Sequence, residues 1–169
     1  MTHLLATLAL LAFPALVIAA AVKDAASYTI PNWISLALIA AFPVAALAAG
    51  LPLGAMGLQA AIGAGALVAG MAMFAAGWIG GGDAKLFAAA ALWLGWPAAL
   101  SFILATGLAG GVLTALLMGL RSAPLRPFAP SGPAWLARLA EPGESVPYGV
   151  AIAVGALCAF PISTLARAL

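Results

Sequence analysis

Six apolar runs, separated by short breaks that hold charges, prolines or glycines, divide this chain almost from end to end. About 20 apolar residues in a helix cross the roughly 30 Å hydrocarbon core of a bilayer, and a helix satisfies its backbone hydrogen bonds internally there. The pattern therefore predicts an all-α polytopic membrane protein. We expect one membrane-embedded domain over residues 1–169, a bundle of about six transmembrane helices. The expected spans are about 4–22, 33–50, 55–78, 84–94, 98–120 and 148–165.

Composition and charge support this class. Hydrophobic residues make up 66% of the chain and charged residues 6%, whereas soluble domains have about a quarter of their residues charged. Six basic residues are too few for a nucleic-acid-binding patch. The single cysteine, Cys158, lies in an apolar run, where we expect a small buried residue. With one histidine, His3, the chain offers no zinc motif, so we expect neither a metal nor a cofactor.

The basic residues also predict the sidedness of the helices. The fourth run is short, so it is either a separate short span or part of one kinked helix over residues 86–120. Lysine and arginine concentrate on the cytoplasmic side, and only the first interpretation puts five of the six on one face. It makes the proline-rich loop 121–147 cytoplasmic, with a short amphipathic segment at Ala134–Ala140 on the membrane surface. The five residues are Lys23, Lys85, Arg121, Arg126 and Arg138.

Asp24 and Asp83 are the only acids in the first 140 residues. A carboxylate near the centre of a membrane helix costs roughly 2.5–3.5 kcal/mol, so acids in or beside spans suggest function. The six-span topology brings both to the cytoplasmic edge of the bilayer. Two close carboxylates can share a proton, one activating water and the other polarising a carbonyl. Taken singly, Asp83 after three glycines is also a plausible helix N-cap, and Asp24 a plausible charge beside a span.

Three motifs occur together in this sequence and in one order. Asp24 precedes Ile30-Pro31-Asn32, Gly80-Gly81-Gly82-Asp83 is followed by Lys85, and Pro147-Tyr148-Gly149 enters the last apolar run. The chain resembles the type IV prepilin leader peptidases, membrane aspartyl proteases of the GxGD type. The resemblance spans most of the chain and implies that Asp24 and Asp83 form the catalytic dyad. The other motif residues would bind substrate or support the site.

The resemblance also implies the biological setting. Large members of the family carry a segment with paired CxxC motifs and methylate the new N-terminus, and this chain has no such segment. It resembles the compact, protease-only form that serves Flp/Tad (tight adherence) pili. We therefore expect an aspartic endopeptidase without N-methyltransferase activity in the cytoplasmic (inner) membrane, with its active site at the cytoplasmic face. Its substrates would be prepilins or pseudopilins, and the pilus assembly machinery is a further possible partner.

Two alternatives stay open at this point. Lys23 and Lys85 flank the aspartates; they would anchor the helix ends on the positive side, or act on a carboxylate or the substrate. The competing function is a membrane transport or scaffold subunit whose aspartates bind protons or ions. Such a transporter would favour acids near the bilayer midplane and matched halves, whereas these acids lie at span ends and no halves match.

Overall fold

A computed structural model describes residues 2–122 and 134–168, and within these ranges it is helical with no strand. The single membrane-embedded domain predicted over 1–169 stays a prediction. The elements are α1 (Thr2–Ser27), α2 (Asn32–Ala48), α3 (Leu53–Ala75), α4 (Gly81–Leu94), α5 (Ala98–Arg121), α6 (Ala134–Leu139) and α7 (Tyr148–Ala159), followed by 3₁₀ turns η2 (Phe160–Ile162) and η3 (Ala166–Ala168).

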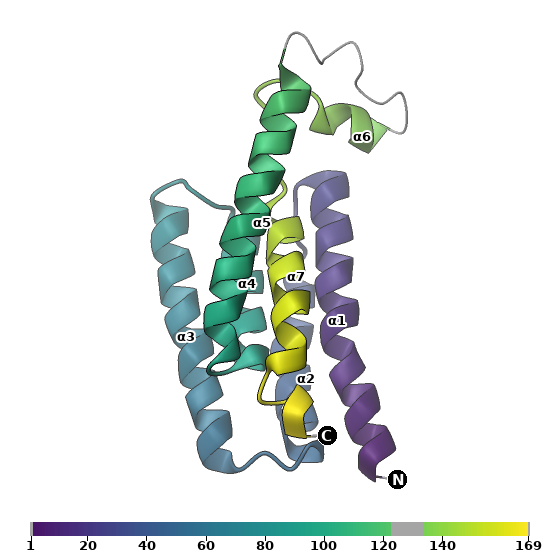
Figure 1. Ribbon diagram of the computed structural model, residues 1–169, viewed down its shortest axis with the longest axis vertical. Helices are drawn as coiled ribbons and strands as arrows, with labels where there is room; N and C mark the ends of the chain where they lie inside the picture. The colour runs from purple at the N-terminus through teal and green to yellow at the C-terminus, as the bar shows by residue number, and fades with distance from the viewer. Residues whose placement is uncertain (1, 123–133, 169) are drawn as a thin grey trace.

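The short helix α4 is the centre of the bundle and contacts α1, α2, α3, α5 and α7. The helix α3 packs against α4, and α5 packs against α7. Figure 1 shows both termini at one end of the bundle, and at the opposite end α5 extends past its neighbours toward α6. The connections that follow α1 and α3 lie at this second end, together with the start of α7 (Figure 1).

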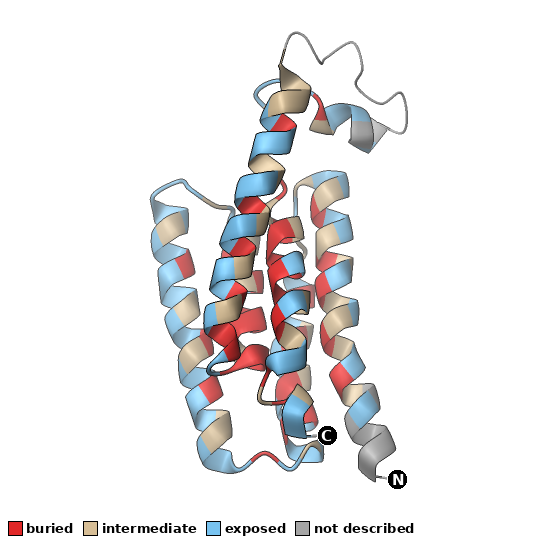
Figure 2. Ribbon diagram, viewed as in Figure 1, coloured by how far each residue is buried: buried red, intermediate tan, exposed pale blue. Residues whose placement is uncertain are grey.

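The interior is mostly apolar, and the outer faces are apolar too. Phe13, Trp93 and Phe102 are fully buried, and Trp93 Nε1–H donates a 2.8 Å hydrogen bond to the Leu38 carbonyl. Figure 2 shows exposed residues along the outer faces of the helices, and these include large apolar side chains such as Leu108. A surface of this kind suits lipid rather than water.

One prediction about burial was wrong. Cys158 is exposed on α7, although we expected a small buried side chain. The reason is that apolar residues cover both the interior and the outside of a membrane bundle. An apolar neighbourhood in the sequence therefore does not distinguish a core position from a lipid-facing one.

Four stretches are long and apolar enough to cross a membrane: Ala9–Ser27, Leu53–Ala75, Ala98–Arg121 and Tyr148–Ala168. The helix α2 is apolar but shorter, and α4 has 14 residues. The kinked single helix over 86–120 is not formed, because Gly95 with φ 64° separates α4 from α5. The count of six spans stays a prediction, as does a membrane-surface location for α6.

Several expected helix boundaries need correction. The first helix continues past residue 22 to Ser27, so Asp24 lies inside its last turns. Its backbone hydrogen bonds do not depend on apolar side chains, and charge alone does not end it. The last helix ends at Ala159 and gives way to 3₁₀ turns at Pro161, which lacks an N–H donor. The predicted loop residue Arg126 lies outside the described residues.

Candidate active site

The two aspartates line one cavity although they come from different helices. Asp24 is on α1 and Asp83 is on α4, and both contribute to a cavity of about 650 Å³ at the end of the bundle near α6. A smaller cavity of about 260 Å³ also contains both residues. The larger cavity is lined by Asp24, Tyr28, Gly77, Trp78, Ile79, Gly80, Asp83, Thr114, Ser145, Val146 and Tyr148.

Asp24 is held by the first turn of α7. Its side chain is buried at 4% exposure, and its Oδ2 accepts a 2.7 Å hydrogen bond from the Gly149 backbone N–H. A Cβ at position 149 would lie 2.8 Å from Asp24 Oδ2 and 2.8 Å from Ile30 Cδ1. Only glycine therefore lets α7 approach this closely, which explains the glycine of the Pro147-Tyr148-Gly149 motif.

Asp83 is held by its own helix. The prediction that it caps α4 from the N-cap position was wrong, because the helix begins at Gly81 and the N-cap is Gly80. Asp83 is the third helical residue, and its Oδ2 accepts a 3.1 Å hydrogen bond from the Gly80 N–H. Its Oδ1 is buried and has no hydrogen-bond partner among residues 2–122 and 134–168. That oxygen remains available to a substrate or a water molecule.

None of the three glycines before Asp83 has a positive φ: Gly80 has φ −73°, and the positive-φ glycines of the described residues are Gly50, Gly77, Gly95 and Gly143. They allow close contacts instead. A Cβ on Gly82 would lie 3.1 Å from Ile30 Cβ, and one on Gly80 would lie 2.9 Å from Asp83 Oδ2. The Gly-Gly-Gly-Asp motif therefore brings the segment after α1 against the start of α4.

The two carboxyl groups can influence each other's protonation. Asp24 and Asp83 line the same two cavities, and neighbouring carboxylates of like charge favour a state in which the pair holds one proton. Each carboxylate has its Oδ2 fixed by a backbone N–H. The arrangement can therefore present one ionised and one protonated carboxyl group to the same space. No group of three or more metal-ligating side chains occurs within the described ranges.

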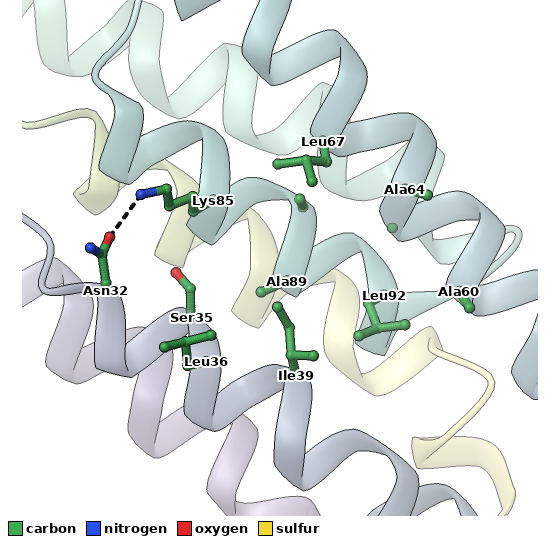
Figure 3. A pocket seen from close by; sticks show the side chains of 12 residues that line it. Asn32, Ser35, Leu36, Ile39, Ala60, Ala64, Leu67, Lys85, Ala89 and Leu92 are labelled. Atoms are coloured by element: carbon green, nitrogen blue, oxygen red, sulfur yellow. Dashed lines mark hydrogen bonds between the residues drawn. The ribbon is translucent and has the colours of Figure 1, made fainter.

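The two lysines lie outside this cavity. Lys23 is exposed on α1. Lys85 Nζ donates a 2.9 Å hydrogen bond to Asn32 Oδ1, and Figure 3 shows this pair at one end of a different cavity. That cavity is about 500 Å³ and lies between α2, α3 and α4, with mostly apolar side chains along it. Pro31 is the N-cap of α2, with β-region backbone angles, and so sets the position of Asn32.

Sequence reasoning missed several residues that line the larger cavity, among them the polar residues Tyr28, Thr114 and Ser145. Tyr28 directly follows α1 and has φ 52°, an unusual angle for a bulky residue. Its N–H donates a 2.7 Å hydrogen bond to the Asp24 carbonyl. Its hydroxyl is buried without a hydrogen-bond partner in the described residues, with the Arg121 guanidinium nearby but outside hydrogen-bonding geometry. Burial raises the pKa of the Tyr28 hydroxyl, which keeps it protonated.

Comparison with protein families assigns the chain to a family. The model of the type IV leader peptidase family matches residues 11–115, more than half of the chain. The chain belongs to the type IV leader peptidase family. The matched region includes Asp24, Asn32 and Asp83 and excludes Gly149. Membership implies a protease, and the apolar helices make it a membrane protein. Searches among curated proteins and among solved structures found no match.

Proposed function

We propose that this protein is an aspartyl prepilin peptidase that removes the leader peptide of small, Flp-like prepilins or pseudopilins. The observation that carries the proposal is the pair of carboxylates, Asp24 and Asp83, which two separate helices bring to one cavity. The family match supports peptide hydrolysis of leader sequences in general. The acids supply a chemistry that needs neither a nucleophilic side chain nor a metal ion.

In the proposed reaction, an ionised carboxylate accepts a proton from water while the water oxygen attacks the scissile carbonyl carbon. The protonated partner donates its proton to the carbonyl oxygen, which gives a neutral gem-diol. The C–N bond then breaks as the carboxyl group that took the proton from water donates it to the amine nitrogen. One hydroxyl of the gem-diol gives its proton to the other carboxylate, which restores the starting protonation of the pair. The N–H groups of Gly149 and Gly80 hold the two Oδ2 atoms during this cycle, so the geometry exists before substrate binds.

The position of the cavity supports action at the cytoplasmic face of the inner membrane. It lies at the bundle end that carries the basic Arg121 and Arg138, while the termini and Arg167 lie at the other end. By the positive-inside rule, the end with more basic residues is cytoplasmic. A leader peptide that reaches the cavity from the cytoplasm would therefore meet the aspartates at the membrane edge.

Co-expression tests this proposal. The protein would be produced together with a candidate Flp-like prepilin in a host that lacks its own prepilin peptidase. We expect the prepilin to shift to a lower mass, and mass spectrometry of its N-terminus should locate a single cut between leader and mature sequence. If panels of prepilins and pseudopilins all stay uncut while the protein accumulates in the membrane, the proposed function is wrong.

A further inference from the structure

One arginine, Arg121, makes an unusual set of contacts at the cavity end of the bundle. It is the last residue of α5 and is half-buried. Its guanidinium donates to three backbone carbonyls that lie 18 to 24 residues further along the chain. The acceptors are the carbonyls of Leu139 (2.9 Å from Nε), Glu144 (2.7 Å from Nη1) and Ser145 (2.9 Å from Nη2).

The segment that Arg121 holds is a wall of the candidate active site. Ser145 and Val146 line the cavity that contains both aspartates. Three residues later, the Gly149 N–H donates to Asp24 Oδ2. A displacement of the segment therefore moves both the wall that faces a substrate and the donor that holds one carboxylate.

The chemistry of the contact requires arginine. A guanidinium is planar and presents five N–H donors in a fixed fork, whereas a lysine ammonium is a compact point charge. Each of the three guanidinium nitrogens donates to a carbonyl of a different residue. The positive charge also interacts favourably with the free carbonyls at the C-terminus of α5. A basic residue that served only as a positive anchor would not need these bonds.

We propose that Arg121 is a positioning residue, whose guanidinium clamps residues 139–145 so that the cavity wall and Gly149 hold their places beside Asp24. This inference rests on the proposed peptidase function for its effect on catalysis. The clamp itself can be tested without substrate. The sequence accounts for Arg121 only as one of several basic residues on the cytoplasmic side.

The test compares Arg121→Lys with Arg138→Lys in the full chain, purified in detergent. Arg138 is an exposed arginine on α6, so its variant controls for the loss of a guanidinium nearby. Amide hydrogen exchange would be measured over residues 139–149 without substrate, and kcat and KM would be measured separately with a cleavable prepilin. Arg121→Ala with millimolar methylguanidinium serves as a second variant, because the added ion can occupy the vacated site.

We expect faster exchange at residues 139–149 in Arg121→Lys and unchanged exchange in Arg138→Lys. We also expect kcat/KM to fall roughly 10- to 100-fold through both a higher KM and a lower kcat, with partial recovery of Arg121→Ala by methylguanidinium. A role in folding alone would reduce the active fraction and leave KM unchanged, and the ion would not restore activity.

The outcomes test the clamp and the proposed peptidase function separately. Unchanged exchange in Arg121→Lys overturns the clamp, whatever the activity. Faster exchange with normal kcat and KM overturns the link between the clamp and catalysis. If the wild-type protein cuts no prepilin, the proposed function and the catalytic role of Arg121 are both wrong, while the exchange data still decide whether the clamp exists.

Discussion

The contact between Gly149 and Asp24 allows a test that leaves both aspartates in place. In Gly149→Ala, the added Cβ would lie 2.8 Å from Asp24 Oδ2 and 3.0 Å from Asp24 Cβ. Real Cβ atoms essentially never approach within 3.0 Å, so either Asp24 or the start of α7 has to move. The movement breaks the 2.7 Å hydrogen bond from the Gly149 N–H.

The magnitude follows from that bond. A hydrogen bond to a charged group contributes about 1.5–3 kcal/mol, and each 1.36 kcal/mol of lost transition-state stabilisation lowers the rate tenfold. We therefore expect kcat/KM of Gly149→Ala to fall roughly 10- to 150-fold. Overpacking also costs stability, about 1–3 kcal/mol, so a lower melting temperature should accompany the kinetic effect.

The assay is cleavage of a detergent-solubilised prepilin at matched enzyme concentration, at a temperature where every variant is folded. Thermal unfolding of each variant is measured in parallel. Gly111→Ala is the matched control, because it is also in a helix and its added Cβ meets no atom within 4 Å. The control should keep its activity and unfold at the same or a higher temperature. If folded Gly149→Ala cleaves as fast as the control, the hydrogen bond to Asp24 does not support catalysis.

Three further predictions concern the topology and the chemistry. Reporter fusions at Ser131 should behave as cytoplasmic, and those at Leu53 and after Leu169 as periplasmic; a periplasmic reporter at Ser131 would show that the six-span topology is wrong. Activity should be unchanged in EDTA, because two carboxylates activate water by themselves, and loss of activity that added zinc restores would count against the dyad. The mature pilin should carry an unmethylated N-terminus by mass spectrometry, since the chain's one cysteine cannot form paired CxxC motifs; methylation by the purified protein and a methyl donor alone would refute this.

The helical class could be predicted from apolar runs, but the helix ends could not. Charge at Lys23 and Asp24 suggested that the first helix stops before them, whereas α1 continues to Ser27. Hydrogen bonding along a helix persists into the interface, where charged side chains are solvated. The short α4 is a related case: its 14 residues pack against five other helices, so length does not decide its existence.

Parts of the site could be predicted because the residues that carry its chemistry stand out in the sequence. The aspartates stood out as rare acids, and their shared cavity agrees with the expectation that they lie on the same side. The contacts of Gly149 and Arg121 could not be predicted, because the first bond spans 125 residues and the others 18 to 24 residues. In each of these hydrogen bonds one partner is a backbone group, so the residue type of that partner does not reveal the bond.

The proposed dyad is tested most directly by Asp24→Asn and Asp83→Asn in the purified protein, assayed against a prepilin that the wild type cleaves. Asparagine keeps the side-chain volume but cannot take up or deliver the proton that the mechanism needs. Each variant should fold and stay in the membrane fraction while cleavage falls to background. Near-normal cleavage by either folded variant, at matched protein concentration, would contradict the aspartyl mechanism.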